Sequence, residues 1–176
     1  SDVEGALLEP LGVALHAVRL ARLDPAESVA VLGAGAIGVC AQLVLAALGA
    51  GQVAVVEPIA GRREWPARLG ADPVAASARE LRDAGFEADL VLECSGDNAA
   101  FEQAVALARP GGRVVVVGIP QPERVSFDAA AARRRELTVV FSRRSRDTLA
   151  EATAMVASSP RSTRSCPRTR TCSARS

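Results

Sequence analysis

The stretch Ser28-Val-Ala-Val-Leu-Gly-Ala-Gly-Ala-Ile-Gly38 decides the fold that this sequence predicts. Residues 29–32 form a short apolar run, which is typical of a strand buried on both faces of a parallel sheet. The run leads directly into Gly33-x-Gly35-x-x-Gly38, and a helical pattern follows from Ala36 to about Leu48. We therefore expect a strand, a tight glycine turn and a helix in direct succession.

The three glycines suit a turn that binds a dinucleotide. Gly33 allows the tight turn, Gly35 lets a pyrophosphate approach the backbone, and Gly38 lets the helix pack closely on the strand. The helix N-terminus offers free N–H groups to the phosphates. A second apolar run ends at Glu57, where an acid would accept hydrogen bonds from the adenosine ribose. A purely structural glycine turn is the alternative, but the order of strand, turn, helix, strand and acid favours the dinucleotide.

The rest of the chain alternates between strand and helix patterns. Further strands are expected at residues 53–56, 73–75, 89–92, 112–118 and 137–141, and further helices at residues 60–69, 77–84, 98–108 and 148–157. This alternation predicts an α/β fold, a Rossmann-type doubly wound six-stranded parallel sheet with helices on both faces. Ligands bind such sheets at the carboxyl ends of the strands, so the loops Cys94–Gly96, Gly118–Pro120 and Ser142–Arg144 should border the crevice.

The segment before the first strand carries a second candidate residue, Glu9. Pro10 suits the first turn of a helix whose apolar face holds Leu11, Leu15 and Val18. This arrangement leaves the Glu9 carboxylate at the helix start and free to point elsewhere. A carboxylate that is merely favoured by the helix dipole is the equally weighted alternative.

The near-neutral net charge of +1 hides an uneven distribution. Residues 1–157 hold 16 Arg against 20 acidic residues, whereas residues 158–176 hold five Arg and no acid. This basic tail lacks Val, Leu and Ile, so it cannot pack a core. An out-of-frame translation is the interpretation that we favour for it. A disordered basic arm and a zinc site using Cys166 and Cys172 are the alternatives.

Targeting and redox signals are few. No run of 18 apolar residues suggests a membrane span, and the acidic start does not resemble a secretory signal. Cys40 and Cys94 fall in a helix pattern and at a strand end, so we expect reduced core thiols. We therefore expect a cytoplasmic protein with no membrane partner and no nucleic-acid partner.

Several spaced motifs together resemble a known superfamily. These are the segment 4–18 with its Glu-Pro pair, the glycine turn, Leu69-Gly-Ala-Asp72, Glu93-Cys-Ser-Gly96 and Arg109-Pro-Gly-Gly-Arg-Val-Val-Val-Val-Gly118. In this order they resemble the medium-chain, zinc-dependent alcohol dehydrogenase superfamily, nearest its sorbitol and threonine dehydrogenase-like branch. The resemblance implies NAD-linked hydride transfer from a secondary alcohol or polyol, with a catalytic zinc that helps the alcohol lose its proton.

The resemblance also implies roles for single residues. Gly33, Gly35, Ile37 and Gly38 would hold the pyrophosphate, and Glu57 would bind the ribose and favour NAD over NADP by repelling a 2′-phosphate. The other implied cofactor contacts are Arg62 on the adenine side, Cys94, Ser95 and Gly96 along the cleft, Val117, Gly118 and Ile119 beside the nicotinamide, and Arg143 after the sixth strand. A solvated surface arginine is the alternative for Arg62 and Arg143.

Glu9 matches the acid of the Glu-Pro motif, which lies at the catalytic zinc. The other zinc ligands of the superfamily belong to an N-terminal catalytic domain, for which this sequence shows no counterpart. We therefore expect a linking helix at residues 1–23, an NAD-binding domain at 24–157 and the basic tail at 158–176. One carboxylate cannot hold a catalytic zinc, so we expect the chain alone to bind NAD weakly or not at all and to be inactive. The intact enzyme would be a homo-oligomer.

Two other classes of protein remain as alternatives. A methyltransferase that uses S-adenosylmethionine also has a glycine-rich first turn and an acid after the second strand. It usually lacks the third glycine and ends in an antiparallel hairpin, for which the sequence gives no sign. A non-catalytic truncated remnant is the second alternative, and salt-sensitive binding to nucleic acid would support it.

Overall fold

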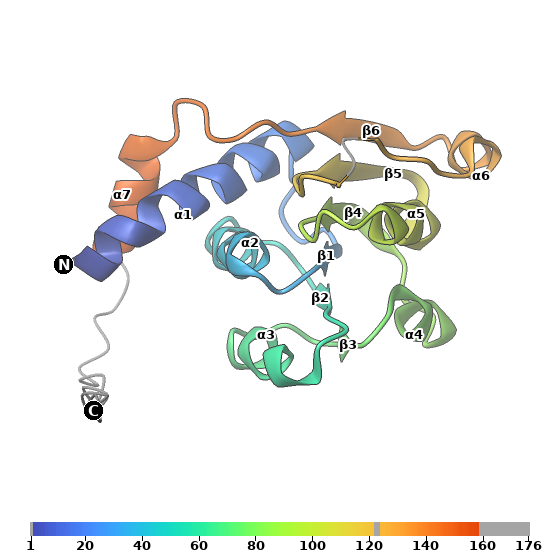
Figure 1. Ribbon diagram of the computed structural model, residues 1–176, viewed down its shortest axis with the longest axis horizontal. Helices are drawn as coiled ribbons and strands as arrows, with labels where there is room; N and C mark the ends of the chain where they lie inside the picture. Colours follow the sequence, from blue (N-terminus) through green and yellow to red (C-terminus); the bar gives the residue numbers. More distant parts are fainter. Residues whose placement is uncertain (1, 122–123, 159–176) are drawn as a thin grey trace, which may run out of the picture.

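The computed structural model describes residues 2–121 and 124–158 and contains one six-stranded sheet (Figure 1). The strands are β1 (Val29–Leu32), β2 (Val53–Val56), β3 (Val74–Ala75), β4 (Ala88–Glu93), β5 (Ala108–Val116) and β6 (Thr138–Phe141). They lie in the order β3-β2-β1-β4-β5-β6, and every neighbouring pair is parallel. The predicted fold class is confirmed, and the switch in strand order lies between β1 and β4.

Helices cover both faces of this sheet. They are α1 (Asp2–Ala21), α2 (Ala36–Ala47), the 3₁₀ turn η1 (Ala60–Arg62), α3 (Glu64–Arg68), α4 (Ala78–Asp83), α5 (Asn98–Leu107), α6 (Ala129–Arg134) and α7 (Leu149–Ser158). Helices α1, α2 and α7 lie on one side of the sheet, and α4 and α5 lie on the other (Figure 1). None of the helices within the described ranges combines the length and apolarity needed to cross a bilayer.

Strand β1 shows why the sequence folds in this way. Val29 and Val31 belong to the apolar core under α1 and α2, whereas Ala30 and Leu32 belong to the core under α4 and α5. All four side chains are buried, as expected for a strand between two helical layers. Fully burying a Val or Leu side chain stabilises the fold by about 1.5–3 kcal/mol, so the apolar run fixes β1 at the centre.

The predicted helix start at Pro10 is wrong. Helix α1 begins at Asp2, so Glu9 and Pro10 lie in its interior, where Pro10 has no N–H to donate to the carbonyl of Ala6. Ala6 is exposed, so water can satisfy that carbonyl. Helix α1 also packs against α2 and α7, which offsets the cost of the proline. The Glu9 carboxylate therefore receives no stabilisation from the positive end of a helix dipole.

Strand β5 was predicted at residues 112–118 but begins at Ala108 and ends at Val116. Two other segments differ in kind from the predicted pattern. Residues 60–69 form η1 and the short helix α3 instead of one helix, and Pro66 lies in the first turn of α3, where an N–H has no partner within the helix. Helix α6 was not predicted, because its sequence Ala-Ala-Ala-Ala-Arg-Arg has no apolar period. Asp128 caps it by accepting hydrogen bonds from the N–H groups of Ala130 and Ala131 at 2.8 and 3.0 Å.

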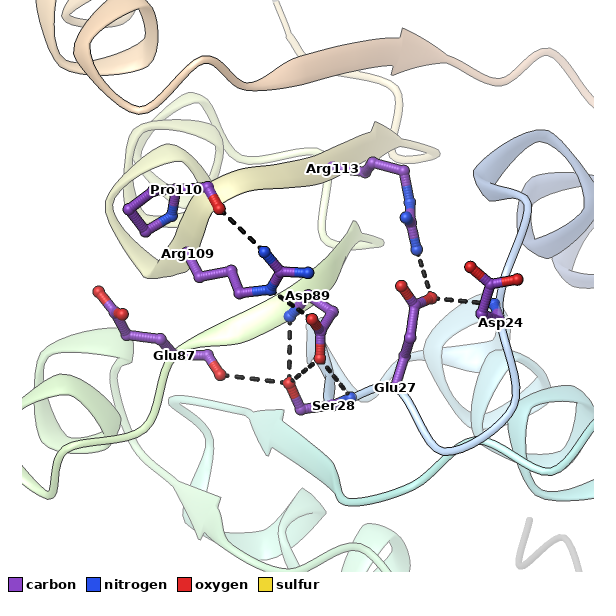
Figure 2. A network of polar contacts seen from close by, with 8 residues as sticks. All are labelled: Asp24, Glu27, Ser28, Glu87, Asp89, Arg109, Pro110 and Arg113. Atoms are coloured by element: carbon purple, nitrogen blue, oxygen red, sulfur yellow. Dashed lines mark hydrogen bonds and ion pairs between the residues drawn. The ribbon is translucent and has the colours of Figure 1, made fainter.

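A polar network joins the amino ends of β1, β4 and β5 (Figure 2). Asp89 accepts hydrogen bonds from the N–H of Ser28 at 2.8 Å and from the Ser28 hydroxyl at 2.6 Å, and it pairs with Arg109. Burial alone would raise the pKa of Asp89, but the hydrogen bonds from Ser28 and Arg109 outweigh it and lower the pKa to about 2. A second ion pair joins Glu27 to Arg113.

Candidate functional site

The turn after β1 requires glycine at two of its three positions. Gly33 has a φ of +96°, and a Cβ there would lie 3.1 Å from the Cα of Ser95. A Cβ on Gly38 would lie 1.9 Å from the carbonyl oxygen of Gly33, closer than any real contact. The fold itself therefore accounts for Gly33 and Gly38.

Gly35 differs, because nothing in the described chain requires it to be glycine. A Cβ at this position would have no atom within 4 Å, and its φ of −74° suits any residue. Gly35 is the N-cap of α2, and no side chain caps the helix there. The first turn of α2, which includes the half-buried Ile37, therefore has no side-chain cap, and its N–H groups are candidate donors to an anionic group.

Glu57, at the end of β2, joins this turn through its side chain. It is only 3% exposed, and its Oε2 accepts a hydrogen bond from the N–H of Ala34 at 2.8 Å. Its Oε1 accepts from the N–H of Ile59 at 2.9 Å. The sequence did not predict these backbone bonds. The predicted contact with a ribose stays a prediction, which must use the remaining lone pairs of the carboxylate.

Glu93, at the end of β4, is a second buried carboxyl group that we did not single out from the sequence. It is 1% exposed. Its Oε1 accepts from the N–H of Ser95 at 2.7 Å, the hydroxyl of Ser95 at 2.5 Å and the N–H of Gly96 at 3.0 Å. An acid that ends an apolar strand directly before a Ser-Gly turn is the signal that could have identified it.

The loops after β4 and β5 touch through their backbones. A Cβ on Gly96, whose φ is +74°, would lie 2.7 Å from the carbonyl oxygen of Ile119, and a Cβ on Gly118 would lie 2.2 Å from the N of Gly96. Val117 is half-buried, and the Ile119 side chain is 70% exposed. Because Ser95 also lies against Gly33, the three loops after β1, β4 and β5 form one continuous surface at the carboxyl edge of the sheet.

Cys94, at the start of the loop after β4, is a half-buried free thiol. Burial, and then the carboxyl group of Glu93, raise its pKa well above the usual value. Burial likewise raises the pKa of Cys40, which lies in α2. A raised pKa keeps both groups as neutral thiols, as expected for cysteines that serve packing.

The two predicted arginines lie on η1 and in the segment after β6, and both are exposed. Arg62 is exposed on η1, and its neighbour Arg63 instead donates a 3.4 Å hydrogen bond to the carbonyl oxygen of Glu57. Arg143 lines an open cleft of about 670 Å³ together with His16, Leu20, Phe141, Arg144, Ser145 and Arg146. No residue of the glycine turn lines this cleft.

Glu9 is exposed and lines a separate cleft of about 520 Å³ between α1 and the start of α7. Gly5, Leu8, Gly12, Ser145, Asp147, Thr148 and Leu149 form the rest of its wall. Among residues 2–121 and 124–158, no three His, Cys, Asp or Glu side chains come together to hold a metal ion. Glu9 alone is therefore not a zinc site, and Cys166 and Cys172 fall outside the described residues.

Comparison with known proteins gives consistent matches. Residues 36–158 match a family described as zinc-binding dehydrogenase. A probable D-xylulose reductase A of Aspergillus clavatus is 37% identical over 147 residues, which are 77% of this chain and 41% of that protein. A sorbitol dehydrogenase of Arabidopsis thaliana is 33% identical over 150 residues, 78% of this chain and 41% of that protein. The chain thus spans about two fifths of the length of these relatives.

Solved structures agree with this assignment. A putative zinc-binding dehydrogenase from Sinorhizobium meliloti, crystallised with NADP bound, superposes with a TM-score of 0.78 at 29% sequence identity. The match covers 88% of this chain and 48% of that one. The described residues contain six parallel strands and no antiparallel pair, which argues against the methyltransferase alternative.

Proposed function

This chain belongs to the zinc-binding dehydrogenase family, and from that premise we propose that it is the NAD-binding part of a zinc-dependent oxidoreductase. The reaction is hydride transfer between a secondary alcohol or polyol and NAD. The polyol branch is supported by the relatives, among which are a D-xylulose reductase and a sorbitol dehydrogenase.

The space at Gly35 is the observation that carries this proposal. Contacts within the chain account for Gly33 and Gly38, whereas Gly35 faces a region without protein atoms beside the uncapped start of α2. A pyrophosphate fits there because it needs a close backbone approach and N–H donors.

The cofactor would lie across the carboxyl edge of the sheet. Its adenosine ribose would bind near Glu57 and Arg62 on the β2 side, with the pyrophosphate over Gly33–Gly38 and Ile37. The loops at residues 94–96 and 117–119 would then receive the nicotinamide half, with Arg143 further along the edge. The buried carboxylate of Glu57 disfavours a 2′-phosphate by charge repulsion, so we propose NAD rather than NADP.

The described residues do not fit a complete zinc site. We propose Glu9 as one contributor to that site in the intact enzyme, where a zinc ion would act as a Lewis acid on the alcohol oxygen. The sequence led us to expect weak binding of NAD or none. The open space at Gly35 supports weak binding, so we propose that the chain alone binds NAD weakly and does not turn over. We also propose that the intact enzyme is a cytoplasmic homo-oligomer, with residues 1–23 as a linking helix, 24–157 as the NAD-binding domain and 158–176 as a separate tail.

The test is a titration of the ¹⁵N-labelled chain with NADH, followed by NMR, which also detects millimolar affinities. We expect the largest shifts at the amides of residues 33–38 and 95–96. S-adenosylmethionine serves as the comparison ligand. The proposal fails if NADH causes no saturable shifts, or if S-adenosylmethionine binds more tightly than NADH.

A further inference from the structure

Glu93 connects two loops of the proposed cofactor site through both its side chain and its backbone. Its Oε1 accepts three hydrogen bonds from Ser95 and Gly96, as described above. Its carbonyl oxygen accepts from the N–H of Val117 at 2.8 Å and of Gly118 at 2.9 Å. The loops after β4 and β5 are therefore both attached to one residue.

Glycine at position 118 makes room for this carboxyl group. A Cβ on Gly118 would lie 2.6 Å from Oε2 of Glu93 and 2.2 Å from the N of Gly96. Any other residue at 118 would push the carboxyl group away from its donors or separate the two loops. The side chain of Glu93 thus has a fixed position between them.

An ordinary strand end does not require such a residue. Burying a polar group costs free energy unless its hydrogen bonds are complete. An apolar side chain, like that of the neighbouring residue Leu92, would fill the position of Glu93 without needing hydrogen-bond partners. The three donors to Oε1 all belong to Ser95 and Gly96, and Ser95 lies against Gly33 of the phosphate turn. Glu93 therefore fixes the position of loops that form the surface at the carboxyl edge of the sheet.

We propose that Glu93 is a positioning residue that holds the loops after β4 and β5 in the shape that receives the nicotinamide half of the cofactor, an inference that rests on the proposed function. The carboxyl group lies below the loops and does not touch the cofactor itself. It acts through Ser95, Gly96 and Gly118.

The order of the strands indicates which loops would receive the nicotinamide. The dinucleotide extends from Glu57 at the end of β2, across the glycine turn after β1, toward β4 and β5. ADP-ribose contains the adenosine, the pyrophosphate and the second ribose but no nicotinamide. Loss of the Glu93 contacts should thus affect NADH more than ADP-ribose, whereas general loosening of the fold would affect both equally.

The experiment measures dissociation constants of NADH and ADP-ribose by NMR titration of the full chain and its variants. Glu93→Met keeps roughly the length of the side chain but removes both carboxyl oxygens, so the N–H groups of Ser95 and Gly96 and the hydroxyl of Ser95 lose their acceptor. We expect NADH to bind about tenfold more weakly and ADP-ribose to change by less than about twofold. Glu102→Met, at an exposed position on α5, is the matched control and should change neither ligand.

Ser95→Ala is the second variant, because it removes one donor to Oε1 and leaves the carboxyl group in place. We expect NADH to bind about threefold more weakly, again with little change for ADP-ribose. Should Glu93→Met fail to fold, this variant decides the question. Equal loss for both ligands, or no loss for either, overturns the inference. If the unmodified chain binds neither ligand, the proposed function fails, and the inference fails with it.

Discussion

The Oε2 atom of Glu57 accepts a hydrogen bond from the backbone N–H of Ala34 at 2.8 Å and so attaches the end of β2 to the turn after β1. The residue proposed to bind the ribose thus also shapes the turn proposed to bind the pyrophosphate. Because Oε1 is used by the N–H of Ile59, both oxygens accept from backbone donors. Glu57 thus has a structural role in the turn, and binding of the ribose is the second role that we propose for it.

Glu57→Gln should therefore lower both stability and cofactor selectivity. The new NH₂ group would face the N–H of either Ala34 or Ile59, so two donors would oppose each other, and we expect a loss of about 1–3 kcal/mol in the free energy of unfolding. The ratio of NADPH to NADH affinity should rise, because the charge that repels a 2′-phosphate is gone. Urea unfolding and NMR titration measure the two effects.

Glu64→Gln is the control for this change, since Glu64 is an exposed carboxylate at the start of α3 and, among the described residues, pairs only with the exposed Arg68. It should leave the stability within about 0.5 kcal/mol of the parent. Unchanged stability and an unchanged ratio of affinities in Glu57→Gln would contradict both roles of this residue.

The glycine turn allows binding and folding to be separated by two substitutions. Gly35→Val places its Cβ in open space with an ordinary φ, so the loss of stability should not exceed the roughly 1 kcal/mol by which valine is a poorer N-cap than glycine. NADH affinity should fall by at least about tenfold, which corresponds to about 1.4 kcal/mol. Gly38→Ala should instead lower the stability by about 1–3 kcal/mol, because its Cβ overlaps the carbonyl of Gly33.

Thermal melts and NADH titrations of both variants distinguish these expectations. If Gly35→Val binds NADH as the parent does, then the pyrophosphate does not occupy the space beside Gly35. If Gly38→Ala is as stable as the parent, the close packing of α2 on β1 is not needed for the fold.

The sequence predicted the sheet well because a strand buried on both faces is apolar at most of its positions, whichever strands lie beside it. The apolar residues of β1, β2 and β4 therefore marked the strands directly. Helix α6 has no such pattern, so the sequence did not mark it. The pairing of β4 with β5 shifts in register between Ala88 and Leu90 of β4, and this shift depends on the neighbouring strand rather than on the local sequence.

The site was predicted only in part, for a similar reason. Glycines at fixed spacing identified the turn, because their role depends on the local backbone. The contacts of Glu57 with Ala34 and of Glu93 with Gly118 join residues that are distant in the sequence, so no local pattern reveals them. Glu9 was misplaced because a proline usually marks a helix start, whereas the packing of α1 outweighs that preference here.

Pro10→Ala tests this last explanation. Alanine restores the N–H that can donate to the carbonyl of Ala6, and it removes the ring from the helix interior, so the free energy of unfolding should rise by about 1–3 kcal/mol. Urea unfolding followed by circular dichroism measures the change. A loss of stability would mean that Pro10 does not lie inside a continuous helix.

Asp89 should make the stability of the chain depend on acid. Its folded pKa of about 2 lies below the usual value of about 3.9 for an unfolded chain, so folding favours the ionised carboxylate. The resulting stabilisation is fully present above pH 4 and is lost as the pH falls toward 2, because protonation then removes the charge that Ser28 and Arg109 bind.

Arg109 is about half exposed (47%), so solvent screens its ion pair with Asp89, and we expect this pair to contribute about 1 kcal/mol to the free energy of unfolding. Asp89→Asn should lower the stability at pH 7 by that amount and flatten the dependence between pH 4 and 2, whereas Asp83→Asn, at an exposed position on α4, should change neither. Urea unfolding at a series of pH values measures both quantities, and parallel curves for the parent and Asp89→Asn would show that this carboxylate does not join β1 to β4 in the way that the structure indicates.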